Sequence, residues 1–117
     1  MTILAIDYGT KRFGLAIAHE GIDAVMPFGV VGRDELQKKI EEARPSTILI
    51  GLPYDMSGRD TELSARIRAF GVSLADSTGI PVEYVDERFT TALGKRTEGG
   101  VSDDEKAAMV MLESYLH

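Results

Sequence analysis

The chain of 117 residues carries 13 basic and 19 acidic side chains, which give a formal net charge of −6 at pH 7. This length allows one compact domain, residues 1–117, and leaves no room for a second. The absence of cysteine excludes disulfides, thiol catalysis and cysteine-based metal sites, and it fits a reducing, cytoplasmic location. Asp7 interrupts the apolar N-terminal stretch, and no apolar run approaches the roughly 18–20 residues of a membrane span. We therefore expect neither a signal peptide nor membrane association.

Short apolar runs and helical periodicity follow one another along the chain. Three β-leaning runs come first and predict an antiparallel meander, over residues 2–6, 13–18 and 24–31. Helical spacing of apolar residues then alternates with strand-like runs, which predicts helices over 33–44 and 60–77 and strands over 47–52 and 81–85. Ser102 and Glu105 have the S-x-x-E spacing of a capping box and mark the start of a C-terminal helix.

The resulting order of elements, βββαβαβα, indicates an α/β fold. Strand–helix–strand connections in the second half should be right-handed crossovers onto parallel strands. The early meander would supply the antiparallel part of the same sheet. We therefore predict a mixed five-stranded sheet with helices on both faces.

Acidic residues lie at the ends of several predicted strands. Asp7 follows the first strand, Asp86 and Glu87 follow the fifth, and Asp103 and Asp104 open the last helix. Because ligands bind beyond the carboxyl ends of parallel strands, these acids are candidates for one shared site. Each also has a structural explanation, since acids at strand ends form turns and acids in a first helical turn are favoured by the helix dipole.

A cluster of carboxylates requires a cation to offset its repulsion. Oxygen ligands favour Mg²⁺ or Mn²⁺, and a pair of such ions suits the attack of water on a phosphodiester. The two histidines, His19 and His117, are expected to be surface residues without a catalytic role.

The segment from Asp7 to Gly14, DYGTKRFG, is the most specific in the chain. Gly9 would let backbone N–H groups approach an anion, while Lys11 and Arg12 bring two cations to the same turn. Tyr8 could stack on a base or pack beneath the turn. The structural alternative for the segment is a plain hairpin with a basic tip.

Four segments in order resemble the YqgF/RuvX family of ribonuclease H-like nucleases, whose members are described as pre-16S rRNA processing nucleases or Holliday junction resolvases. The matching segments cover nearly the whole chain and read AIDYGTKRFGLAIA from Ala5, IGLP from Ile50 with MSG from Met56, VDERFTT from Val85, and Asp104 with AA from Ala107 and LESYL from Leu112. Four motifs in register are far more specific than any one of them.

The resemblance implies a ribonuclease H-like fold with three catalytic carboxylates that hold the metal. These fall on Asp7, Glu87 and Asp104, with Glu87 preferred to its neighbour Asp86 and Asp104 preferred to Asp103. Asp86 and Thr10 would then have supporting roles.

The candidate ligands for substrate phosphates are basic residues near these acids: Lys11, Arg12, Arg88, Lys95 and Arg96. Arg88 has an alternative role, since it could serve only to neutralise the neighbouring acids. Members of the family usually carry a longer helix and a basic loop before the last aspartate, where this chain has only residues 92–103. This shortening puts substrate choice and the placement of Asp104 in question more than the fold.

The function implied is metal-dependent hydrolysis of phosphodiester bonds, foremost in processing the 5′ end of pre-16S rRNA. The partners would be structured RNA or branched DNA, and the protein would act as a monomer or a weak homodimer. The alternatives are a Holliday junction resolvase and a non-catalytic RNA-binding assembly module. The Asp7-Tyr8-Gly9-Thr10 turn also resembles a phosphate loop of actin-like ATPases and sugar kinases, but those proteins need two such domains.

Overall fold

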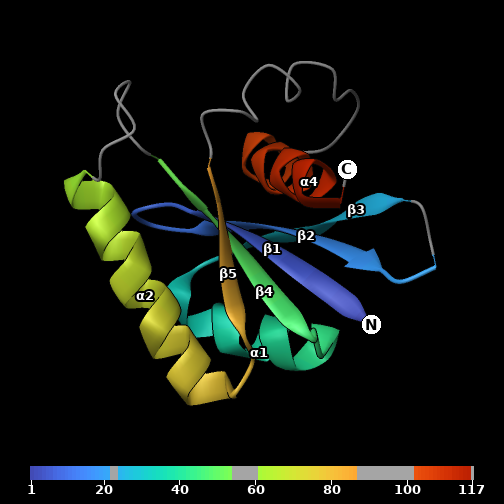
Figure 1. Cartoon of the computed structure of the whole chain (residues 1–117), viewed down its shortest axis with the longest axis horizontal. Helices are drawn as coiled ribbons and strands as arrows, with labels where there is room; N and C mark the ends of the chain where they lie inside the picture. The colour runs from blue at the N-terminus through green and yellow to red at the C-terminus, as the bar shows by residue number, and fades with distance from the viewer. Residues whose placement is uncertain (22–23, 54–60, 87–101, 117) are drawn as a thin grey trace.

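The computed structural model describes residues 1–21, 24–53, 61–86 and 102–116. The described residues form a five-stranded sheet with helices on both faces, as predicted (Figure 1). The strands are β1 (Thr2–Tyr8), β2 (Phe13–His19), β3 (Val25–Val31), β4 (Thr47–Leu52) and β5 (Val82–Asp86). The helices are α1 (Arg33–Ala43), α2 (Glu62–Thr78) and α4 (Asp103–Leu116). Within this part of the chain, no helix has the length and apolar character needed to cross a membrane.

The strands lie in the order β3-β2-β1-β4-β5 and combine both kinds of pairing. Neighbours β1, β2 and β3 are antiparallel, which confirms the predicted meander. Strands β1, β4 and β5 run parallel to one another, so their carboxyl ends lie at the same edge of the sheet. This shared edge is where the sequence predicts the site.

Side chains alternate between two apolar layers along each strand. One layer joins Leu4 and Ile6 of β1 to α1 and α2 through Leu36, Ile40, Ile67 and Leu74. The other layer joins Ala5 of β1 and Leu49 of β4 to α4 through Ala108, Met111 and Leu112. The central strands are therefore buried on both faces. Alternate residues of a strand form a row of side chains on one face, and that face determines which helices the row contacts.

Strands β1 and β5 extend further than the sequence predicts. Asp7 lies within β1 and pairs with Gly14 of β2, and Asp86 lies within β5 and pairs with Leu52 of β4. The apolar run alone ends the first strand at residue 6, but ladder pairing continues past it. Both acids are thus held in the regular alternation of a strand and not in a loop.

Capping residues account for the helix boundaries. Helix α1 ends as predicted before Pro45, with Arg44 in the left-handed region at φ 47°. Helix α2 starts two residues later than predicted because Thr61 is its N-cap: the Ser64 N–H donates to Thr61 Oγ1 at 3.1 Å. Gly79, at φ 73°, closes α2 as predicted.

Candidate active site

Asp7 lies on the face of the sheet that α4 covers. In β1, Ile3 and Ala5 belong to the α4 layer, whereas Leu4 and Ile6 belong to the layer of α1 and α2. Because side chains alternate along a strand, the side chain of Asp7 lies on the same face as those of Ile3 and Ala5, the face that α4 covers. Its side chain is partly buried.

The first turn of α4 lies against the strand beside Asp7. Gly14 pairs directly with Asp7, so any side chain at position 14 would share the face of Asp7. A Cβ placed on Gly14 would overlap the backbone carbonyl group of Asp104. Glycine at this position therefore lets α4 approach the sheet closely, and it brings Asp104 to the part of β2 that adjoins Asp7.

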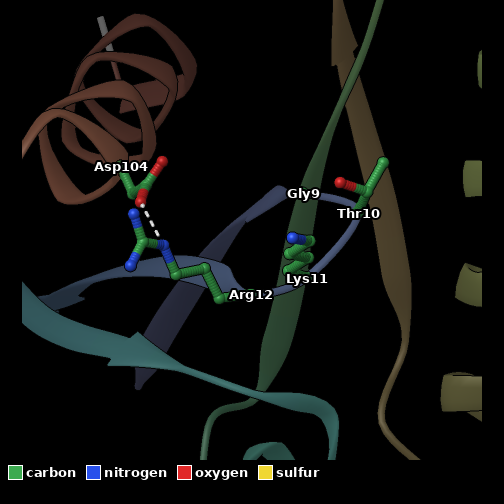
Figure 2. Close-up of a pocket in the computed structure, with 5 residues that line it drawn as sticks. All are labelled: Gly9, Thr10, Lys11, Arg12 and Asp104. Carbon is green, nitrogen blue, oxygen red and sulfur yellow. Dashed lines mark ion pairs between the residues drawn. The ribbon is translucent and has the colours of Figure 1, made fainter.

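The turn between β1 and β2 forms one wall of an open pocket of about 430 Å³, whose lining residues are Gly9, Thr10, Lys11, Arg12 and Asp104 (Figure 2). A Cβ on Gly9 would overlap the carbonyl oxygen of Arg12, so the tightness of the turn requires glycine. Thr10, Lys11 and Arg12 are exposed. The pocket thus joins the basic turn to one of the predicted catalytic acids.

Arg12 and Asp104 form an ion pair across this pocket. Arg12 Nε lies 3.3 Å from Asp104 Oδ2, and Figure 2 shows the two side chains pointing toward each other. The side chain of Arg12 is 69% exposed and that of Asp104 39% exposed. The sequence predicts both residues to belong to one site, but it does not indicate that they pair, because they belong to distant segments.

Helix α4 begins with the predicted capping box. The Glu105 N–H donates to Ser102 Oγ at 3.1 Å, and the Ser102 N–H donates to Glu105 Oε1 at 3.3 Å. Asp103, Asp104 and Glu105 are all in the first turn, where the helix dipole favours acids. Asp103 is exposed and Asp104 is half-buried, so only the latter lies toward the sheet in the pocket.

Asp86 takes the opposite face from Asp7. In β5, Val82 and Tyr84 pack in the layer of α1 and α2, and Val85 packs in the layer of α4. By alternation, Asp86 belongs to the row of Val82 and Tyr84. Asp86 therefore lies at the end of β5, but its side chain does not share the face of Asp7.

Tyr8 also belongs to the opposite face and packs there. Its ring makes edge contacts with Phe13 and Phe70, with ring centroids 5.6 and 5.1 Å apart. Arg33 donates from Nη2 to the Tyr8 hydroxyl at 3.0 Å. Of the two roles considered for Tyr8, the structure supports packing beneath the turn.

Four of the predicted site residues lie outside the described residues: Glu87, Arg88, Lys95 and Arg96. Of the three predicted carboxylates, the described structure therefore contains Asp7 and Asp104. Both offer the hard oxygen donors that Mg²⁺ and Mn²⁺ prefer, so their chemistry fits such an ion. Within the described ranges, no group of three or more histidine, cysteine or acidic residues is placed to hold a metal.

Solved structures of similar fold come from RuvC of Thermus thermophilus. One matches with a TM-score of 0.61 and 19% identity, and covers 99% of this chain and 95% of RuvC. RuvC in complex with a Holliday junction substrate matches with a TM-score of 0.64 and 16% identity, over 99% of this chain and 94% of that one. The fold is therefore of the RuvC-like, ribonuclease H-like α/β class.

Sequence comparison identifies the family within this class. The model of the RuvX family, described as Holliday junction resolvase, matches residues 1–117, and the chain belongs to this family. A relative from Rickettsia bellii (strain OSU 85-389), named "Putative pre-16S rRNA nuclease", is 35% identical over 131 residues, covering 98% of this chain and 85% of the relative. A relative of the same name from Maridesulfovibrio salexigens is 35% identical over 132 residues, covering 99% of this chain and 98% of the relative.

These alignments are longer than the chain itself, which has 117 residues. The two relatives therefore carry residues that this chain lacks, in agreement with a shortened sequence. The segment in which the shortening is expected, 92–103, lies mostly outside the described residues.

Proposed function

We propose that residues 1–117 form one metal-dependent nuclease domain that hydrolyses phosphodiester bonds in nucleic acid. The observation that carries the proposal is the approach of Asp104, from the last helix, to the face of the sheet on which Asp7 lies. In this proposal Asp7, Glu87 and Asp104 hold Mg²⁺ or Mn²⁺. Because Asp86 belongs to the opposite row of β5, the second carboxylate is assigned to Glu87, with Asp86 in a supporting role.

The residues of the chain would bind and orient the substrate. Lys11 and Arg12 are exposed beside Asp104 and can each donate hydrogen bonds to a backbone phosphate. The hydroxyl of Thr10 lines the same pocket and can donate to a phosphate oxygen. Divalent ions, when bound, would supply an activated water and would offset negative charge on the leaving oxygen. The carboxylates would determine the position of this positive charge relative to the phosphate.

The primary substrate class we propose is structured precursor rRNA, cleaved during maturation of the 5′ end of pre-16S rRNA. The names of the relatives at 35% identity support this choice. The second candidate is a four-way DNA junction, supported by the description of the family. Arg88, Lys95 and Arg96 are proposed as further phosphate ligands.

Replacing Asp7 by Asn tests the proposed chemistry. The change keeps the shape of the side chain but removes the negative charge that holds a cation. We expect Asp7→Asn to lower Mn²⁺-dependent cleavage by at least about a hundredfold, because several kcal/mol of charge stabilisation are lost. Cleavage is measured on precursor rRNA, single-stranded RNA and four-way DNA junctions.

The matched control is Asp76→Asn, an exposed acid near the end of α2 on the other side of the sheet. It should leave cleavage within about twofold of the parent, as expected for a surface change remote from the site. Equal activity of the parent and Asp7→Asn would overturn the proposal. Tight RNA binding by the parent without any metal-dependent cleavage would instead support the non-catalytic assembly module.

A further inference from the structure

Glu105 connects the start of α4 to the edge strand β3. Its Oε1 accepts hydrogen bonds from Ser102, from the backbone N–H at 3.3 Å and from the hydroxyl at 3.0 Å. Its Oε2 accepts from the backbone N–H of Gly29 at 2.8 Å. One carboxylate thus completes the capping box and also holds the first turn of α4 to a strand far away in sequence.

A bulge in β3 makes this connection possible. Leu15 pairs with Gly29 and Ala16 pairs with Pro27, so Phe28 is an extra residue between two ladder pairs. Gly29 has φ 107°, a conformation that glycine adopts readily and other residues rarely do. The N–H of Gly29 is therefore available to an acceptor on α4, and Glu105 supplies it.

We propose that Glu105 is a positioning residue that holds Asp104 in the metal site. The proposal rests on the proposed function, in which Asp104 is a metal ligand. Asp104 precedes Glu105 in the same helical turn, and its backbone lies against Gly14 opposite Asp7. Contact with Gly14 stops α4 from moving closer to the sheet, and the bond to Gly29 stops its first turn from moving away. Together these contacts fix the height of Asp104 above the face of Asp7.

The side chain of Glu105 has a structural role that differs from that of its neighbours. Both of its oxygens already accept hydrogen bonds from protein groups, whereas Asp104 faces an open pocket and Asp103 is exposed. The three consecutive acids of this turn thus differ in role: Glu105 holds the helix, Asp104 faces the pocket and Asp103 faces solvent. This division explains how an acidic run can place one carboxylate accurately.

The Mn²⁺ affinities of three variants can distinguish a positioning role of Glu105 from an effect of its negative charge alone. Glu105→Gln keeps the shape of the side chain but replaces one acceptor oxygen by an NH₂ group, which only donates. The glutamine side chain therefore cannot accept hydrogen bonds from both Ser102 and Gly29 in the way that the carboxylate does. Glu105→Asp keeps the charge but is too short to reach both partners. Asp103→Asn removes a charge from the same turn without disturbing either contact. The affinity for Mn²⁺ is measured by isothermal titration calorimetry, and the thermal unfolding midpoint is recorded for each protein.

Both Glu105 variants should bind Mn²⁺ about tenfold more weakly than the parent, in line with the loss of groups that orient metal ligands. Asp103→Asn should change the affinity by less than about twofold. The Glu105 variants should need more Mn²⁺ to reach full activity. In cleavage assays at saturating Mn²⁺, they should lower kcat while the KM for nucleic acid stays unchanged. A simple loss of stability would not produce this split, since the folded fraction binds metal normally.

Two results would overturn the inference while leaving the proposed function intact. The first is an unchanged Mn²⁺ affinity in both Glu105 variants. The second is a Mn²⁺ affinity that Asp103→Asn and Glu105→Gln weaken equally and that Glu105→Asp leaves unchanged. If Glu105→Gln does not fold, Glu105→Asp alone decides between these results. Failure of the parent protein to bind Mn²⁺ would overturn both the inference and the proposed function.

Discussion

Arg12 has two possible partners in the candidate site. In the structure its guanidinium pairs with Asp104, and in the proposed complex it binds a backbone phosphate. A cation held by Asp104 would repel the guanidinium, so binding of metal would favour the release of Arg12 toward a phosphate. Metal and nucleic acid should therefore each increase the affinity of the protein for the other.

Replacing Arg12 by Gln should have opposite effects on the two ligands. Because an exposed ion pair contributes about 0.2–1 kcal/mol, Arg12→Gln should tighten Mn²⁺ binding by up to about fivefold. Loss of one phosphate contact should reduce the slope of log affinity against log salt by about 0.7–0.9. Calorimetry with Mn²⁺ and filter binding over a range of salt concentrations measure the two effects.

Lys11→Gln is the matched control for Arg12→Gln, since Lys11 lines the same pocket and forms no ion pair among the described residues. It should reduce the salt dependence in the same way but leave Mn²⁺ affinity unchanged. Tighter Mn²⁺ binding in both variants would show that net charge, and not the pair with Asp104, sets the effect.

Tyr115, at the end of α4, should make the free energy of unfolding depend on pH in the alkaline range. Its hydroxyl donates to Glu83 Oε2 at 2.6 Å, and this hydrogen bond, with smaller contributions from burial and the charge of Glu83, raises the pKa of Tyr115 above 10.0. A raised pKa in the folded state gives stability that is present below pH 10 and is lost as the phenol ionises. Tyr115→Phe should therefore show a smaller loss of stability between pH 9 and pH 11 than the parent, measured by urea unfolding. Parallel curves for the two proteins would contradict this assignment.

The contact between α4 and β2 depends on the absence of a side chain at position 14. Gly14 is buried, and Asp104 occupies the space into which its Cβ would point. Helix α4 covers β1 and β2 through Ala108, Met111 and Leu112, so its N-terminal turn is one end of an extended packed interface. A small displacement at this end would move Asp104 directly.

Gly14→Ala should separate the first turn of α4 from the sheet. Inserting a methyl group into a packed interface costs about 1–3 kcal/mol, because neighbouring backbone must shift. We expect a loss of that size in the free energy of unfolding, together with weaker Mn²⁺ binding by the folded protein. Urea unfolding and calorimetry measure the two effects. An unchanged affinity for Mn²⁺ in a destabilised Gly14→Ala protein would show that the height of α4 does not control the site.

For the whole molecule, the charge balance predicts how metal affects nucleic-acid binding. The chain has a formal charge of −6, and residues 101–117 contribute half of it. Two bound divalent cations would add four positive charges and bring the formal charge to −2, with Lys11 and Arg12 beside them. The acidic composition that argues against indiscriminate coating of nucleic acid is therefore compatible with binding that requires metal.

Binding to precursor rRNA should be at least about tenfold tighter in Mg²⁺ than in chelator at constant ionic strength, because bound metal reduces the repulsion between the acids and phosphates. A filter-binding assay measures this ratio. Asp7→Asn is the control: it should bind in chelator at least as well as the parent and gain little from Mg²⁺. Equal affinities of the parent with and without Mg²⁺ would contradict the prediction.

The sequence by itself determined the order of elements, the mixed sheet and the capping box of α4. These features depend on local periodicity and on contacts between residues close in sequence, such as Ser102 and Glu105. It also predicted Asp7, Arg12 and Asp104 as site residues, because the motifs that contain them resemble a known family. Apolar runs did not show where β1 and β5 end, since ladder pairing and not hydrophobicity extends them through Asp7 and Asp86.

Only the tertiary structure decided which acids share a face and what holds them there. Asp7 and Asp86 both lie in the last two residues of parallel strands, yet alternation places them on opposite sides of the sheet. The ion pair of Arg12 with Asp104 and the bond of Glu105 to Gly29 join segments from opposite parts of the chain. Such contacts depend on strand register, on a bulge in β3 and on the missing side chain at Gly14, which combine only when the elements pack.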